Sequence, residues 1–317
     1  MRQKKWKMMI LGLVICVLTG CGQVQQEESM RCITFYRSIK GVNSVILSVA
    51  KNIEKQLKKQ DQIWISTYEL PDESYLSLDY KVDMAILLEM DAVILNGTKS
   101  DGDQEAYQKL KDAGIPFILV DGDNEESGRY AYIGTDNVQA GCEAAKAAAE
   151  QFEKCTVGIL SAPVQEGNRT SRSRDQRREG FLKESEEQDN ISVVGECVCP
   201  NQLLEAIPVM REFLDEYPEM NVLFCLDSAS GIAAAKVIEE RGIQEEMYVI
   251  CFDLPVQVEE EIQNGGIDVT LLQDTEKTAE ACIQVLKELK EGENLNEGQK
   301  ISVECRMITK EDLEQPE

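Results

Sequence analysis

The chain has 317 residues, of which 43% are hydrophobic, and it carries a formal net charge of −25. This length is enough for one large domain or two medium domains with a full hydrophobic core. The acidic balance repels phosphate, whose neutralisation requires clustered lysine and arginine, so it argues against nucleic acid as a partner.

The first twenty residues have the pattern of a secretory signal peptide. Four basic residues within positions 2–7 precede an apolar run over positions 8–18. This run is far shorter than the ~20 residues that span a bilayer as a helix, and no later segment is both long and apolar enough. Removing residues 1–20 changes the formal net charge from −25 to −29, because four basic residues and no acidic residue are lost.

The leader ends in Leu18-Thr19-Gly20-Cys21, which resembles the lipobox of bacterial lipoproteins. The resemblance implies that the Cys21 thiol is acylated and that cleavage leaves Cys21 as the first residue. Two acyl chains hold a protein stably at a membrane surface, whereas one does not. Residues 21–30 would then be a lipidated tether, and the protein would be extracytoplasmic and anchored to the bacterial cell membrane. The alternative is an ordinary signal peptide, or a short anchor, with an incidental cysteine.

Nine cysteines remain when Cys16 in the leader and Cys21 are set aside. The number is odd, and these cysteines lie in apolar, strand-like runs, which favours free buried thiols over disulfides. Cys197 and Cys199 form a C-x-C pair, but the chain has no histidine and no second pair of this kind. A zinc site needs a fuller ligand set, so we expect neither a metal nor another cofactor.

From Arg31 onward, short β-rich runs alternate with helical patterns. This alternation is typical of α/β proteins, in which helices cover both faces of a parallel sheet. The expected strands form two sets, the first at 33–36, 63–67, 92–95 and 116–120, and the second at 156–160, 192–197, 222–226, 248–252 and 269–272. The sequence therefore predicts two doubly wound parallel sheets.

Polar residues stand at the ends of several of these strands. Asp121, Asp227 and Asp253 each follow an apolar run, and Gln273 follows another. Ligands of open parallel sheets bind beyond the carboxyl ends of the strands, so these four residues predict a binding site. The alternative is that each aspartate is a helix N-cap, and Asp227 is the best candidate for that role.

Longer phrases of the sequence contain these residues. They include YIGTDNVQAGCEAAKAAAEQF from Tyr132, RREGF ending at Phe181, NVLFCLDSASGIAAAKVIEERG from Asn221, VICFD ending at Asp253 and VTLLQDTEKTA from Val269. Their order and spacing resemble the ribose-type periplasmic solute-binding family, whose fold also serves as the effector domain of lactose-repressor-like regulators. A repressor would need a DNA-binding headpiece, and here a lipoprotein-type leader stands in its place.

The resemblance implies a type I periplasmic binding protein fold, in which two lobes joined by three strand-like crossings close on a ligand. The N-terminal lobe would comprise residues 31–134 and 274–299, and the C-terminal lobe residues 135–273 and 300–317. The first crossing would include Thr135 and Asp136, and the second Gln273 and Asp274. The third would lie near residues 299–302.

The resemblance also implies which side chains bind ligand hydroxyl groups and ring oxygens. Carboxylates accept hydroxyl protons, and a guanidinium presents a planar fork of donors to oxygen atoms. For Arg177 the alternative is a solvated helix face, because other arginines surround it. The candidate ligand-binding residues are Asn43, Asp121, Arg177, Asp227, Asp253 and Gln273.

Several positions depart from the family pattern. Gly122 and Leu226 stand where relatives carry Arg and Asn, and Val45 and Ile46 replace aromatic residues that sandwich a sugar ring. Because ring stacking stabilises the apolar face of a pyranose, its loss argues against an ordinary hexose site. The expected ligand is a small polar molecule, a sugar or a sugar derivative.

Three functions are compatible with this sequence. The first is a solute receptor for an ABC importer, and the second is a sensory protein that signals to a membrane histidine kinase or chemoreceptor. Both require lobe closure driven by tighter ligand binding to the closed form. An enzyme is the least favoured, because the sequence has no histidine, no Gly-x-Ser-x-Gly elbow and no phosphate-binding P-loop.

Overall fold

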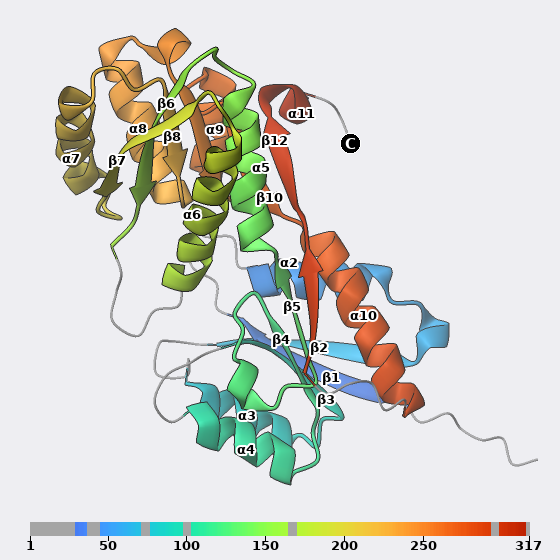
Figure 1. The fold of residues 1–317 in the computed structure, drawn as a ribbon. Helices are drawn as coiled ribbons and strands as arrows, with labels where there is room; N and C mark the ends of the chain where they lie inside the picture. The colour runs from blue at the N-terminus through green and yellow to red at the C-terminus, as the bar shows by residue number, and fades with distance from the viewer. Residues whose placement is uncertain are drawn as a thin grey trace, which may run out of the picture.

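The computed structural model describes residues 29–36, 45–70, 77–97, 103–163, 170–292 and 298–314. Cys21 and Asn43 lie outside these residues. The described chain forms two lobes, each built on a six-stranded sheet, as expected for a doubly wound α/β fold (Figure 1). No helix among these residues is long and apolar enough to cross a membrane.

The sheet of the N-terminal lobe is entirely parallel and has the strand order β11-β5-β4-β3-β1-β2. Its strands are β1 (Met30–Tyr36), β2 (Ile63–Glu69), β3 (Ala92–Asn96), β4 (Phe117–Val120), β5 (Ala131–Thr135) and β11 (Gln299–Val303). Strand β2 is at one edge of this sheet, and β11 is at the other.

Helices cover both faces of this sheet (Figure 1). Helices α3 (Leu78–Leu87) and α4 (Asp103–Asp112) lie on one face, and α2 (Val45–Gln56) and α10 (Thr275–Glu291) lie on the other. Along β1, Ile33 packs with the first pair of helices and Cys32 with the second. Burial on both faces explains why the strands read as continuous apolar runs without alternation.

The sheet of the C-terminal lobe has the order β12-β10-β9-β8-β6-β7. Its strands are β6 (Cys155–Ser161), β7 (Ile191–Val198), β8 (Val222–Cys225), β9 (Tyr248–Phe252), β10 (Val269–Gln273) and β12 (Cys305–Thr309), of which β12 alone is antiparallel to its neighbour. Helices α5 (Asn137–Ala149) and α6 (Thr170–Glu187) pack on one face, and α7 (Leu203–Glu216), α8 (Ser228–Arg241) and α9 (Val256–Asn264) on the other. The short helix α11 (Lys310–Glu314) follows β12.

The chain passes three times between the lobes. The first two passages lead from β5 into α5 and from β10 into α10. Asp136 and Asp274 are the N-caps of these helices, and their carboxylates accept hydrogen bonds from the backbone N–H of Gln139 and Lys277. Such bonds satisfy donors that a helix start otherwise leaves without a partner.

The third passage differs from the expectation that it lies near residues 299–302. Strand β11 pairs with β5 over its whole length, from Gln299 opposite Ala131 to Val303 opposite Thr135. The chain therefore leaves the N-terminal sheet only at Glu304, and residues 300–303 belong to the N-terminal lobe. The apolar positions of β11 pack on the helix α10 core, which holds the strand in that sheet.

All nine cysteines of the described chain are free. Cys197 and Cys305 are partly exposed, and the other seven are buried. Burial raises the pKa of the Cys251 thiol to about 12, which keeps it protonated and unreactive near neutral pH. Seven of the nine lie in the core, as the sequence predicted, whereas Cys197, also expected there, lies half-buried at its margin.

One carboxylate makes the fold sensitive to pH. Asp268 precedes β10, and its Oδ2 accepts a hydrogen bond of 2.7 Å from the backbone N–H of Val249. Burial raises the pKa of this carboxyl from 3.8 to about 6. The folded protein therefore binds this proton more tightly than the unfolded chain does, so the resulting stability is present below about pH 4 and is lost as the pH rises through about 6.

We expect Asp268→Asn to raise the free energy of unfolding at about pH 8 by on the order of 2 kcal/mol. The amide oxygen keeps the bond from Val249, and no buried charge remains. At about pH 4 the variant and the parent protein should have nearly equal stability, because Asp268 is then protonated in the folded protein. Urea denaturation at both pH values measures the difference. An equal gain at both would contradict a protonation effect.

Candidate functional site between the lobes

A cavity of about 440 Å³ lies between the two lobes. Its lining includes Val45 and Ser48 from α2 and Thr275 from α10, all in the N-terminal lobe. From the C-terminal lobe, Asp253 and Gln273 at the carboxyl ends of β9 and β10 line it. The cavity has the size and concave shape of a small-molecule site.

A chain of hydrogen bonds joins the lobes beside this cavity. The Gln273 side-chain Nε2 donates to Asp253 Oδ1 at 3.1 Å. Its Oε1 accepts from the Thr135 hydroxyl, also at 3.1 Å. Thr135 is the last residue of β5 in the N-terminal sheet. Gln273 therefore connects Asp253, at the carboxyl end of β9 in the C-terminal lobe, to the strand that leads into the first passage between the lobes.

Asp121 and Asp253 occupy equivalent places in the two lobes. Each directly follows a strand, and each has a left-handed backbone, with φ of 67° and 64° respectively. A side-chain hydroxyl fixes the carbonyl of each, since Tyr132 donates to Asp121 O at 3.2 Å and Thr270 donates to Asp253 O at 2.6 Å. Non-glycine residues in this backbone region carry strain, and such residues concentrate at functional sites.

The Asp121 carboxylate lies at the rim of the N-terminal sheet. Its Oδ2 accepts a 3.0 Å hydrogen bond from Asn96, the last residue of β3. Asp121 is not among the residues that line the cavity with Asp253 and Gln273. The structure therefore brings two of the predicted ligand-binding residues together and places Asp121 apart from them, on the other lobe.

Arg177 is buried inside the C-terminal lobe and is only 6% exposed. Its Nη1 donates to the Leu226 carbonyl at 2.8 Å and its Nε to Asn137 Oδ1 at 2.9 Å. The guanidinium carbon lies 3.8 Å from the centre of the Phe252 ring, a cation–π contact of the strong, desolvated kind. The alternative that Arg177 lies on a solvated helix face is wrong, because these partners hold its side chain in the interior of the C-terminal lobe.

Asp227 is the N-cap of α8, as the capping interpretation predicted. Its Oδ1 accepts from the backbone N–H of Ser230 at 2.9 Å. Its Oδ2 accepts from Ala162 N at 2.9 Å and from Arg174 Nη1 at 3.2 Å. Arg174 is itself buried, so the pair is internal to the lobe. A direct role for Asp227 in ligand binding stays a prediction.

Arg306 also lines the cavity, although no feature of the sequence predicted it there. It lies on β12, the strand that follows the third passage between the lobes. Its Nε is 3.8 Å from the Asp274 carboxylate at the start of α10. No local motif marks this arginine, because only the antiparallel pairing of β12 with β10 brings it to the cavity.

Two α/β lobes, three connections and a cavity between the lobes define a two-lobed solute-binding protein of type I. The family model for the periplasmic binding protein domain matches residues 80–294, and the chain belongs to that ribose-type family. The family consists of extracytoplasmic binding proteins and not of enzymes.

Known relatives span nearly the whole chain. The ribose import binding protein RbsB of Bacillus subtilis is 23% identical over 300 residues, which cover 92% of this chain and 95% of that protein. GanP, a glucose-galactose binding protein from Geobacillus stearothermophilus, has a TM-score of 0.72 at 22% identity and covers 91% of this chain and 100% of its own. XylFII, in its complex with LytSN, has a TM-score of 0.74 at 23% identity and covers 90% and 100%.

Proposed function

We propose that this protein captures a small polar ligand, a sugar or a sugar derivative, between its lobes and delivers it to an ABC importer. The observation that carries the proposal is the cavity lined from both lobes, with Asp253 and Gln273 at the ends of neighbouring strands. The names of similar proteins support it, since RbsB is a ribose import binding protein and GanP binds glucose and galactose.

The rim side chains suit a ligand rich in hydroxyl groups. Gln273 Nε2 donates to Asp253 Oδ1, and Asp253 Oδ2 would accept a hydrogen bond from a ligand hydroxyl group. A carboxylate accepts hydroxyl protons, and closure of the lobes would bring the Asp121 carboxylate to the same ligand. Ligand binding would then shift the population of the protein toward its closed form.

The walls of the cavity bear on the class of sugar. Val45, Leu203 and Leu272 line it, and none of the described lining residues is aromatic. Aliphatic side chains fill space against a ligand but do not stack on a pyranose ring as an aromatic face does. This composition favours a pentose, a polyol or a modified sugar over an ordinary hexose.

A thermal-shift screen of the purified protein against pentoses, hexoses, polyols, nucleosides and amino acids tests the proposal. A ligand present at about 100 times its Kd should add ~2.7 kcal/mol of stability. Stabilisation by a sugar or polyol is the expected result. Stabilisation by amino acids alone would contradict the sugar assignment, and turnover of a glycoside would contradict the binding-protein assignment.

We further propose that Cys21 carries the lipid anchor. Cys21→Ser should move the protein out of the detergent-soluble membrane fraction or leave the leader uncleaved, because the acylated thiol is lost. The leader offers a matched control in Cys16→Ser, which removes a thiol without touching the Leu-Thr-Gly-Cys motif. Fractionation of cells with an antibody readout measures both variants. Equal membrane retention of the Cys21 variant together with normal cleavage of its leader would contradict the lipobox interpretation.

A sensory role is the second candidate function. The structure of XylFII in complex with LytSN supports it, because that protein of similar fold assembles with another polypeptide. Reconstitution separates the two roles. The liganded protein should stimulate the ATPase activity of its cognate permease complex in the first case, and should change the autophosphorylation of a histidine kinase in the second.

A further inference from the structure

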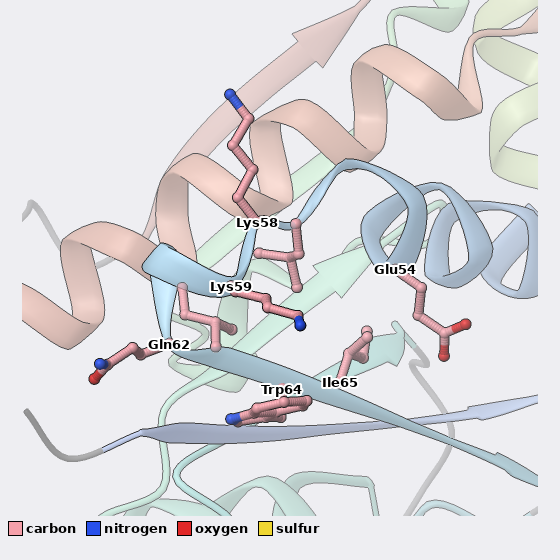
Figure 2. A pocket seen from close by; sticks show the side chains of 8 residues that line it. Glu54, Lys58, Lys59, Gln62, Trp64 and Ile65 are labelled. Carbon is pink, nitrogen blue, oxygen red and sulfur yellow. The ribbon is translucent and has the colours of Figure 1, made fainter.

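A second cavity, of about 250 Å³, lies on the outer edge of the N-terminal lobe. It is at the carboxyl end of α2, whereas the ligand cavity is at the amino end of the same helix. Figure 2 shows it framed by α2, by the short 3-10 helix η1 (Lys59–Asp61) and by the edge strand β2. Trp64 of β2 is 63% exposed here, which is unusual for so large an apolar side chain.

Two lysines and one glutamate line the cavity with this tryptophan, and the carboxylate of that residue, Glu54, accepts a hydrogen bond of 2.9 Å from the Thr67 hydroxyl. Lys58 and Lys59 are both exposed, and in Figure 2 the Lys59 side chain reaches across the cavity above Trp64 while Lys58 points away from it. The neighbouring Asp61 carboxylate is paired with Lys287 at 3.0 Å. We call the surface formed by Leu57, Lys58, Lys59 and Trp64 the Trp64 edge.

The tether enters the fold beside this surface. Met30, the first residue of β1, pairs with Ile63, and Arg31 pairs with Trp64. The Met30 N–H donates to the Gln62 carbonyl at 2.9 Å. Eight residues separate Cys21 from Met30 in the sequence, and a chain of that length spans at most about 30 Å. A lipid on Cys21 would therefore hold the Trp64 edge close to the bilayer.

We propose that the Trp64 edge rests on the headgroups of the anionic bilayer to which the chain is tethered. Tryptophan is enriched at membrane interfaces, where its ring is partly buried and its N–H stays hydrated. Lysines near an anionic surface are attracted to it, whereas the mature body as a whole, with a net charge of −29, is repelled. Among the orientations that the tether permits, the one with this edge toward the membrane is favoured.

The same contact covers an exposed sheet edge. Among the described strands, β2 pairs with β1 alone and is the last strand at this edge of the sheet. Such edges are prone to pair with a second chain unless something covers them. A tether raises the effective concentration of the surface at the membrane, so the individual contacts need not be strong. The inference rests on the lipid anchor proposed above.

The fluorescence of Trp64 tests this inference directly. The chain has two tryptophans, and the other, Trp6, lies in the leader, so Trp64 is the only one in the mature protein. The purified lipidated protein is reconstituted into vesicles of phosphatidylglycerol and phosphatidylcholine, with and without lipids brominated near the headgroup. We expect Trp64 emission to shift to shorter wavelength and to fall about twofold in the brominated vesicles.

Charge reversal provides the matched comparison. Lys58→Glu with Lys59→Glu should abolish the quenching, because the Trp64 edge then becomes acidic. Lys154→Glu with Lys183→Glu changes the net charge equally at exposed positions of the C-terminal lobe and should leave the quenching intact. Equal loss of quenching in both double variants would overturn a local role for Lys58 and Lys59.

Flotation of the same vesicles separates failure of the inference from failure of the anchor. Protein that floats with the vesicles but shows no quenching overturns the Trp64 contact and leaves the anchor standing. Protein that does not float overturns the anchor and the inference with it. A shift to shorter wavelength that grows with protein concentration, without quenching by brominated lipid, assigns the edge to a second copy of the chain and overturns the membrane contact.

Discussion

Gly180→Ala should lower the free energy of unfolding by about 1–3 kcal/mol, although alanine favours a helix by about 1 kcal/mol over glycine. A Cβ at Gly180 of α6 would lie 1.9 Å from the Val138 carbonyl oxygen of α5. The reciprocal contact is as close, because a Cβ at Gly141 of α5 would lie 2.0 Å from the Arg177 carbonyl oxygen of α6. The two backbones touch at these glycines, so the methyl group must push the helices apart.

Urea denaturation monitored by circular dichroism measures this effect, with Glu179→Ala as the control. Glu179 is the exposed neighbour of Gly180 on α6, and its replacement should change stability by less than about 0.5 kcal/mol. Combining Gly141→Ala with Gly180→Ala should cost less than the sum of the two, since one separation of the helices relieves both clashes. An unchanged urea midpoint for Gly180→Ala would show that the helices do not need this close approach.

Removing either rim carboxylate should weaken ligand binding strongly. For the ligand found in the thermal-shift screen, we expect Asp253→Ala and Asp121→Ala each to cost about 1.5–3 kcal/mol of binding free energy, or roughly tenfold to 150-fold in Kd. The physical reason is the loss of a charged acceptor for ligand hydroxyl groups. Isothermal titration calorimetry measures Kd. Without ligand, each variant should lose about 1–2 kcal/mol of stability, because it removes the hydrogen bond from Asn96 or Gln273 and places alanine in a left-handed backbone.

Asp227→Ala is the matched control, because Asp227 is also a rim aspartate but its carboxylate is occupied by the protein. Its loss removes an N-cap and leaves the buried Arg174 guanidinium without its carboxylate. We expect a stability loss of about 2–4 kcal/mol, larger than the ~1 kcal/mol of a cap alone, with little change in Kd. If Asp227→Ala abolishes binding while Asp121→Ala does not, the proposed site is wrong.

The strands were largely predictable from the sequence. Buried parallel strands read as short apolar runs, and each of the nine expected runs is a strand or forms most of one. Strand β5, which begins at Ala131, was expected only as a passage between lobes, because its run is interrupted by Gly134. Strands β11 and β12 were also missed as such. Exposed residues alternate with half-buried or buried ones along β11, β12 is half-buried except for the exposed Arg306, and no continuous apolar run marks either strand.

The candidate site was predictable only in part. The positions of Asp121, Asp253 and Gln273 after strands follow from the topology of a parallel sheet. The contacts of Arg177 could not be predicted from the sequence, because Arg174 and Arg178 are the same residue type on the same helix and yet have different partners. Arg177 lies on Phe252, Arg174 pairs with Asp227, and Arg178 pairs with the exposed Glu196. Tertiary contacts decide among three similar side chains.

The free cysteines make unfolding of this protein difficult to reverse where thiols are oxidised. The described part of the chain carries nine thiols without disulfide partners, and the chain belongs to a family of binding proteins that work in compartments where thiols oxidise readily. While the lobes stay folded, burial shields most of these sulfur atoms from oxidants. A chain that unfolds exposes all of them at once, and any disulfide formed then would hold together residues that the native core keeps unpaired. The working lifetime of the protein outside the cytoplasm is therefore set by how slowly it unfolds, and not only by how stable it is at equilibrium.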